Sequence, residues 1–116
     1  MNEIFNKIAA AILDVLPRNR AFKYTTLKIK RLKGNVGFTG YFVSDNGIRE
    51  SLDIWNFALE TDEIHKLYEL TQSQPLQHKD WNRAKFTLYP DGKFDMEYIW
   101  DQELQDKVDK YNSSSE

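Results

Sequence analysis

The sequence predicts an α+β protein in which helices pack on one face of an antiparallel sheet of about five strands. Two observations lead to this prediction. Turn signals join successive strand patterns as hairpins, which pair antiparallel, and helix patterns occur only before, between and after the hairpins. The expected order is α-β-β-β-α-β-β-α. At 116 residues the chain is expected to form one domain, residues 1–116, with a core that needs neither metal nor disulfide.

The first half of the chain has one helix pattern and two strand patterns. Apolar residues recur at helical spacing over residues 2–16, which predicts an amphipathic helix that ends at Pro17. Apolar and polar residues then alternate over 22–32 and again over 36–42. This period of two is typical of half-buried strands, and the segment 33–35 between them is expected to be a turn.

A third strand and a second helix are expected next. The segment DNG at 45–47 predicts a type I′ turn, because Asn and Gly tolerate positive φ angles. The third strand is expected to hold Ile48, Glu50, Leu52 and Ile54 on one face. Thr61 is expected to cap a helix that ends before Pro75. The buried stripe of this helix is predicted to be Ile64, Leu67, Tyr68 and Thr71.

The segment KFTLYPDGKFDMEYIWD, residues 85–101, predicts a hairpin with its turn at Asp91 and Gly92. The side chains expected to face the helices are Phe86, Leu88, Phe94, Met96, Tyr98 and Trp100. By alternation, Lys28 and Lys30 on one strand and Asp95 and Glu97 on another are expected on the opposite, open face. The chain should close with a polar helix carrying Leu104, Val108 and Tyr111, followed by a frayed NSSSE end.

Few residues fit catalytic or metal chemistry. The chain has no cysteine, and His65 and His78 stand outside any known metal-ligand or acid/base spacing. No glycine-rich loop precedes a helix, and no apolar pocket is indicated that would raise the pKa of one of the many carboxylates. We therefore expect no enzyme, no catalytic residue, no metal and no cofactor.

Charge is distributed unevenly along the chain. Residues 1–44 hold eight Lys/Arg and two Asp/Glu, whereas residues 45–116 hold eight and sixteen, for a net charge of −2. Such asymmetry favours a charged partner. The apolar run at 8–13 is too short for a secretory signal or a membrane span, so a cytoplasmic protein without membrane contact is expected.

The basic segment RNRAFKYTTLKIKRLK, residues 18–33, supports one alternative function. Its lysines and arginines are interleaved with Phe22 and Tyr24, and cations with aromatics are what a surface needs to track phosphates and stack bases. An isoelectric point of about 5.7 disfavours a nucleic-acid partner. A small nucleic-acid-binding module that uses residues 18–33 is therefore kept as the alternative hypothesis.

The segment DWNRAKFTLYPDGKFDMEYIWD resembles the signature of the YezG-like immunity proteins, in which a tryptophan opens a strand and a T-x-L-x-x-D-G-K-F hairpin follows. The matching positions are Trp81, Thr87, Leu88, Asp91, Gly92, Lys93, Phe94, Tyr98 and Asp101. FNKIAAAILDVLP and IHKLYELTQSQ also look like helices of that family. Residues 18–33 are more basic than expected of the family, which puts the charge of the partner in question.

The resemblance implies an immunity protein that neutralises the C-terminal toxin domain of a contact-dependent growth inhibition or polymorphic toxin system, often a nuclease, by stoichiometric binding. A nuclease presents cationic surface, to which clustered carboxylates are complementary. Expected toxin contacts are Asp91, Asp95, Glu97 and Asp101, then Asp53, Glu60, Asp62 and Glu63, with Trp55 and Tyr89 as aromatic anchors. Two arrangements are possible for Asp95 and Glu97: they pair with the protein's own lysines, or they meet a cationic toxin.

Overall fold

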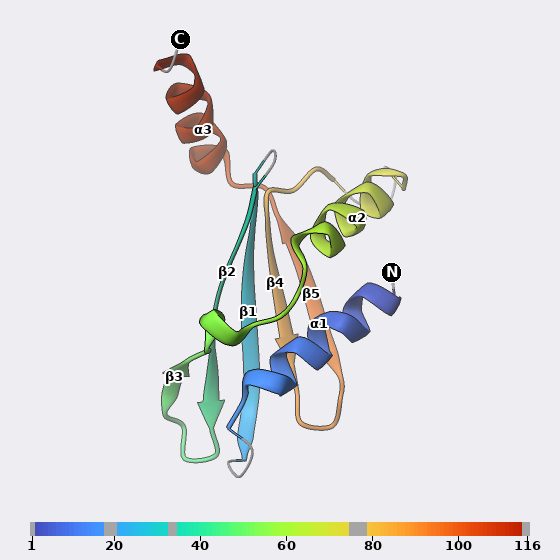
Figure 1. Ribbon diagram of the computed structural model, residues 1–116, viewed down its shortest axis with the longest axis vertical. Coiled ribbons are helices and arrows are strands. Elements are labelled where there is room, and N and C mark those ends of the chain that lie inside the picture. The colour runs from blue at the N-terminus through green and yellow to red at the C-terminus, as the bar shows by residue number, and fades with distance from the viewer. Residues whose placement is uncertain (1, 18–20, 33–34, 75–78, 115–116) are drawn as a thin grey trace.

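The protein is seen here as a computed structural model that describes residues 2–17, 21–32, 35–74 and 79–114 (Figure 1). The elements are α1 (Asn2–Val15), β1 (Phe22–Leu32), β2 (Asn35–Ser44), β3 (Arg49–Ser51), the 3-10 helix η1 (Ile54–Asn56), α2 (Thr61–Gln72), β4 (Arg83–Leu88), β5 (Phe94–Ile99) and α3 (Gln102–Ser114). This order confirms the predicted α+β class. Residues 33–34 of the predicted turn, and His78, fall outside the described residues.

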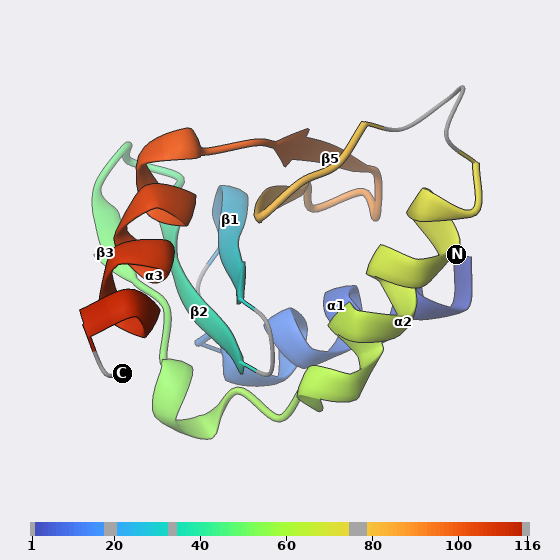
Figure 2. The ribbon, with the colours of Figure 1, turned by 90° about the horizontal axis from the view of Figure 1, so that it is seen from above.

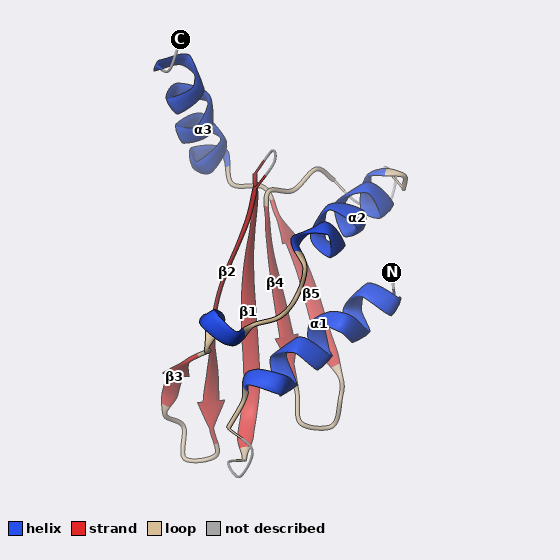
Figure 3. Cartoon of the chain, viewed as in Figure 1, coloured by secondary structure: helices blue, strands red, loops and turns tan. Residues whose placement is uncertain are grey.

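The five strands form one antiparallel sheet in the order β3-β2-β1-β4-β5 (Figure 3). The central strand β1 pairs with β2 on one side and with β4 on the other, so that Leu27 lies opposite both Gly40 and Phe86. Because side chains alternate along a strand, this register puts Leu27 and Ile29 on one face and Lys28 and Lys30 on the other. The period-two prediction for β1 is confirmed.

The core lies between that first face and the helices α1 and α2, which pack side by side across it (Figure 2). Ile8 and Ile12 from α1 and Leu67 from α2 are fully buried against Leu27 and Phe86. Burying each such side chain stabilises the fold by about 1.5–3 kcal/mol before the entropy cost. Two helical stripes therefore cover one face of the sheet and leave the other to solvent.

The turn between β2 and β3 and the turn between β4 and β5 have the same construction. The amides of Gly47 and Gly92 donate to the carbonyls of Ser44 (2.9 Å) and Tyr89 (3.0 Å), three residues earlier. Both glycines have positive φ, 84° and 88°, and no other described residue does. A type I′ turn needs positive φ at both central residues, so the prediction for DNG was wrong. Each loop is a type I turn followed by a left-handed glycine.

Three further local predictions were wrong. The third strand contains only Arg49–Ser51, because Ile54 begins η1 and Ile48 is 55% exposed at the end of the turn. The N-cap of α2 is Glu60 rather than Thr61. Trp100 is 42% exposed and donates from Nε1 to Gln102 at 2.9 Å, because β5 ends one residue earlier and the chain turns away from the core.

The last helix, α3, projects beyond the end of the sheet (Figure 1). Leu104 in its first turn is buried, while Tyr111 near its far end is 75% exposed. Residues 112–114 of the predicted frayed end still belong to α3. The helix is therefore anchored at its N-terminal turn and presents most of its length to solvent.

Candidate interaction surfaces

The two faces of the molecule carry opposite charge. Acidic residues gather on α1, α2 and the segment between β3 and α2: Glu3, Asp14, Asp53, Glu60, Asp62, Glu63 and Glu69. The described cations of these same elements are Lys7 and Lys66. By strand register the open face of the sheet carries Lys28, Lys30, Arg49, Arg83 and Lys85, with Asp95 and Glu97 on the edge strand β5. The folded molecule is therefore acidic on its helical face and mainly basic on its sheet face.

Trp55 is the most exposed large apolar side chain of the described chain, with 98% of its surface open to solvent. The residues on either side of it are anchored, since Ile54 packs against the core and the ring of Phe57, which follows η1, lies 5.1 Å from that of Phe38. Asp53 accepts a hydrogen bond from Asn56 at 2.7 Å, which closes the turn around the tryptophan. The fold therefore holds Trp55 exposed on η1, and η1 lies on the helical side of the sheet (Figure 2).

Glu63 links the two helices of the core layer. Its carboxylate accepts from Lys7 Nζ at 3.0 Å and lies 3.6 Å from Lys66 Nζ. The hydrogen bond from Lys7 lowers the pKa of Glu63, and the same contact raises the pKa of Lys7. A groove of about 500 Å³ runs beside this pair, lined by Lys7, Ala10, Ala11, Asp14, Ala58, Leu59, Glu60 and Glu63. Of the four acids predicted as a second contact cluster, Glu63 is engaged in holding α1 to α2.

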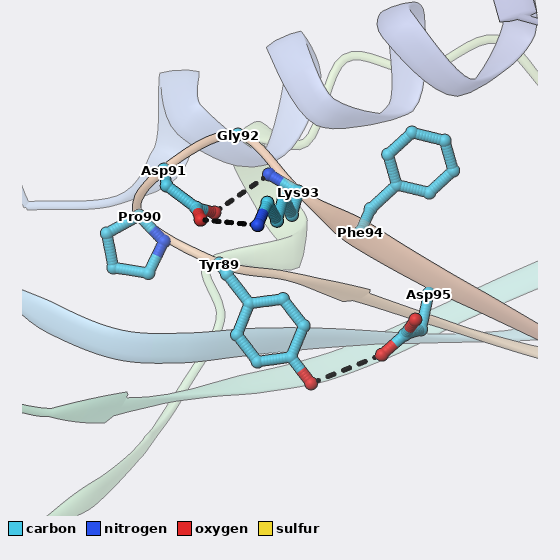
Figure 4. A pocket seen from close by; sticks show the side chains of 7 residues that line it. All are labelled: Tyr89, Pro90, Asp91, Gly92, Lys93, Phe94 and Asp95. Carbon is cyan, nitrogen blue, oxygen red and sulfur yellow. Dashed lines mark hydrogen bonds and ion pairs between the residues drawn. The ribbon is translucent and has the colours of Figure 1, made fainter.

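The turn between β4 and β5 forms a surface hollow of about 830 Å³. Asp91 accepts from the backbone amide of Lys93 at 3.0 Å and lies 3.9 Å from its Nζ (Figure 4). Tyr89 donates to Asp95 at 3.3 Å, and burial together with this carboxylate raises the pKa of Tyr89. Phe94 also lines the hollow; its ring extends to the opposite side from that of Tyr89 and stacks on Phe86 (Figure 4). Asp91 thus stabilises its own turn, and Asp95 is held by a tyrosine.

Glu97 lies directly opposite Lys85 across the β4–β5 pair. Within the described part of the chain, however, neither side chain makes an ion pair at 4.0 Å or closer, and Asp95 pairs with no lysine. The structure therefore brings the hairpin acids beside the protein's own cations without joining them.

Asp101 is the most strongly engaged of the predicted contact acids. It receives a hydrogen bond from Arg83 Nε at 2.6 Å and another from the amide of Leu104 at 3.1 Å, which caps α3. The Arg83 contact, followed by the Leu104 amide, lowers the pKa of Asp101. Sequence reasoning missed Asn82, whose buried side chain binds the backbone of Asp101 through both amide atoms, at 2.7 and 2.8 Å. Asp101 therefore joins β4 to the start of α3.

The basic segment 18–33 does not stay together on one surface. Arg31 lies on the core side, with its guanidinium 3.4 Å from the ring centre of Tyr68 and a hydrogen bond of 2.8 Å to the carbonyl of Trp81. Phe22 packs against the core, and residues 18–20 and 33 fall outside the described chain. Lys28 and Lys30 are exposed on the open face.

Two cations from β4 join those of β1 on the open face. Lys85 lies opposite Lys28, and Arg83 lies opposite Lys30. Sequence reasoning did not find this group, because β1 and β4 are about 55 residues apart and only their pairing brings the four side chains together. The only available signal was the alternation that put Lys28 and Lys30 away from the core.

Three tyrosines lie across the sheet next to these cations. The ring of Tyr24 is 6.5 Å from Tyr41 and 6.5 Å from Tyr89. Arg49 from β3 stacks on Tyr41 at 3.9 Å, and Lys28 approaches the same ring at 5.8 Å. The open face therefore combines an aromatic row with a cationic group.

Comparison with protein-family models and with curated proteins finds no match to this chain. In residues 2–17, 21–32, 35–74 and 79–114 no group of three or more His, Cys, Asp or Glu is arranged to hold a metal ion. No helix in these ranges is both long and apolar enough to span a membrane.

Proposed function

We propose that the chain is an immunity protein that binds a toxin domain in a stoichiometric complex and so prevents its action in the producing cell's cytoplasm. The observation that carries this proposal is the exposure of Trp55 on the acidic, helical side of the molecule. A large apolar side chain held in water is typical of a residue that a partner protein buries, and tryptophan is enriched among the residues that dominate binding energy. The hairpin that resembles the YezG-like signature supports the same function.

The charge around Trp55 suits a cationic partner. Asp53 precedes it, and Glu60 and Asp62 follow at the entrance to α2. A nuclease domain needs a cationic surface to bind phosphates, so these carboxylates would attract it over a distance and speed its association. Burial of the indole would then slow dissociation, since most differences in affinity lie in the off-rate. The acids thus speed association, and the tryptophan slows dissociation.

The hairpin acids remain a second proposed contact. Asp95 and Glu97 lie on the edge strand β5, at the opposite end of the strand order from β3 and η1. Glu97 faces Lys85 there, so the local field is more mixed than around Trp55. The geometry therefore favours the Trp55 surface as the first contact, and the two surfaces are tested separately.

The test uses the C-terminal domain encoded by the reading frame just upstream of this one. That domain is expressed from an inducible promoter in a bacterial host with and without the present chain, and the purified pair is titrated calorimetrically. We expect growth to be rescued and a one-to-one complex to form. Toxicity that the intact chain does not relieve, together with no heat of binding, would refute the proposed function.

Three variants then locate the contact. Trp55→Ala is expected to weaken binding by about thirtyfold or more, the cost of truncating a central interface tryptophan. Asp53→Lys/Asp62→Lys is expected to slow association mainly. Asp95→Lys/Glu97→Lys tests the hairpin. The matched control, Asp106→Lys/Asp109→Lys, makes the same charge change on α3. Undiminished binding by Trp55→Ala would remove the Trp55 surface while leaving the function intact.

A further inference from the structure

The open face of the sheet keeps four cations in two adjacent rungs of the central strands. Lys28 faces Lys85 and Lys30 faces Arg83, each directly across the β1–β4 pair. Directly opposed side chains have Cβ atoms about 5 Å apart, and like charges at that spacing destabilise a sheet. Of the four, only Arg83 has an ion pair in the described chain, with Asp101. Glu97 lies opposite Lys85 on the other side of β4 without an ion pair, so the acids on this face offset the repulsion between the two rungs only in part.

Aromatic side chains lie beside the cations on the same face. Tyr24, Tyr41 and Tyr89 form a row across β1, β2 and the end of β4, with neighbouring ring centres 6.5 Å apart. Tyr89 is 37% exposed, and Tyr24 and Tyr41 are partly exposed. In the strand register Tyr41 lies opposite Thr26, in the rung next to that of Lys28 and Lys85. Stackable rings thus lie within a few residues of unpaired lysines.

We propose that this open face binds single-stranded nucleic acid, with phosphates on Lys28, Lys30 and Lys85 and bases against the tyrosine row. Charge complementarity identifies the occupant as a polyanion, and the adjoining rings distinguish a polymer with flat bases from one without them. Sheets that leave one face open and present aromatics on it are an established way to stack the bases of single strands. This site is separate from the Trp55 surface, which lies on the helical side, whereas the hairpin acids Asp95 and Glu97 share the open face with it.

The sheet face selects a single strand over a duplex. Cations at alternate positions of one strand are spaced by about 6.6 Å, so they follow an extended backbone across a flat surface. A duplex keeps its bases stacked on each other and unavailable to the tyrosines. Arg49 on Tyr41, at 3.9 Å, adds a further cation at the end of the aromatic row.

Binding is measured by the fluorescence anisotropy of labelled oligo(dT) and oligo(rU) of about 15 nucleotides, across a salt series from about 50 to 200 mM. With three or four phosphates contacted, the logarithm of the affinity is expected to fall against the logarithm of salt with a slope of about −2 to −3. No anisotropy change at the lowest salt would overturn the proposal.

Variants separate the two kinds of contact. Lys28→Glu/Lys30→Glu is expected to weaken binding at least roughly tenfold and to flatten the salt slope by about 0.7 per cation removed. Tyr24→Leu is expected to weaken binding by roughly tenfold with the slope unchanged, because stacking releases no counterions. The control Lys107→Glu/Lys110→Glu makes the same charge change on α3 and should bind like the parent. Thermal unfolding of each variant checks that it is folded.

Two competitors decide the class of the ligand. Polyglutamate offers the charge of an acidic protein segment without bases, and a duplex of the same length offers phosphates without accessible bases. The proposal expects each to compete at least tenfold more weakly than oligo(dT). Equal competition by polyglutamate would assign the face to an acidic protein, and equal competition by the duplex would remove the stacking contact; either result overturns the proposal as stated. Loss of toxin binding by Trp55→Ala has no bearing on these outcomes.

Discussion

Asp101 shows how one carboxylate connects three parts of the chain. Its two oxygens receive hydrogen bonds from Arg83 of β4 and from the amide of Leu104 in α3, while Asn82 binds its backbone. These contacts lower its pKa because they favour the charged form. The residue was expected at a partner's surface on the grounds of its charge, and its geometry gives it a clear role inside the fold.

The pH dependence of unfolding tests this role. A carboxyl group whose pKa is lower in the folded state than its ordinary 3.8 contributes stability that is complete above about that pH and is lost as the pH falls further, through the folded pKa. Asp101→Asn should therefore lower the free energy of unfolding at pH 7 and flatten its decline below pH 4. Urea unfolding at a series of pH values measures both effects.

The control is Asp106→Asn, which removes an exposed carboxylate from α3, the helix that Asp101 caps. With this variant the free energy of unfolding should decline below pH 4 in nearly the same way as it does for the parent. If Asp101→Asn and Asp106→Asn gave the same pH profile, Asp101 would have no special part in joining β4 to α3.

Many side-chain contacts could not be predicted from the sequence, because they join segments that are far apart along the chain. Alternation placed Lys28 and Glu97 on the open face correctly, since it depends only on neighbours along one strand. Arg31 shares the period of the core-facing positions, yet its charge suggested a surface. Its stacking on Tyr68 could not be predicted from β1 alone, because it depends on where α2 packs against the sheet. Asn82 carries no pattern at all, because its partners are backbone atoms of a segment 19 residues away.

At the scale of elements, β1 and β2 pass unusually close to each other at Gly40. A Cβ atom built there would lie 2.6 Å from the carbonyl oxygen of Thr26 and 3.1 Å from Leu52 Cδ2. The first neighbour is backbone of the central strand and cannot move aside without disturbing the pairing. Gly37 lies on the same strand with no atom within 4 Å of the equivalent position.

These two glycines form a matched pair for mutagenesis. Gly40→Ala should lower the free energy of unfolding by about 1–3 kcal/mol, the usual cost of forcing extra atoms into a packed site. Gly37→Ala should change it by no more than about 0.5 kcal/mol, as is usual for an open surface position. Urea denaturation of the two variants beside the parent measures the difference, and equal stabilities would show that the strands separate at no cost.

The element pattern itself was largely predictable, and the misses share a cause. Long periodic segments such as α1, β1 and α2 were found nearly to their ends, because each repeats its signal over two or more turns or pleats. The errors fell at β3, at the cap of α2 and at Trp100, where an element stops. A stop depends on which hydrogen bonds the neighbouring strand offers, and that information lies elsewhere in the chain.

At the scale of the whole molecule, the cations of the two rungs have opposite effects on stability and on the proposed binding: their repulsion destabilises the sheet, while their charge attracts phosphates. Lys28→Glu replaces a like-charge pair with an opposite-charge pair against Lys85. We expect it to raise the free energy of unfolding by about 0.2–1 kcal/mol at low salt, with a smaller gain at high salt, while it weakens nucleic-acid binding.

Chemical denaturation at two ionic strengths measures that gain, with Lys107→Glu on α3 as the control of equal charge. A variant that unfolded more easily than the parent would indicate that Lys28 has a favourable partner, and the argument from repulsion between the rungs would fail. A more stable variant with weaker binding would show that the two lysines are kept on this face despite their effect on the fold.

The helical layer and the open sheet face are stacked along the shortest dimension of the molecule, which is 22 Å (Figure 2). In physiological salt the screening length is about 8 Å, so a charge on one face is felt only weakly beyond the other. Each approaching partner therefore responds mainly to the charges of the face that it meets, and the net charge of −2 describes neither face. A small chain can in this way present itself as an acid to one partner and as a base to another.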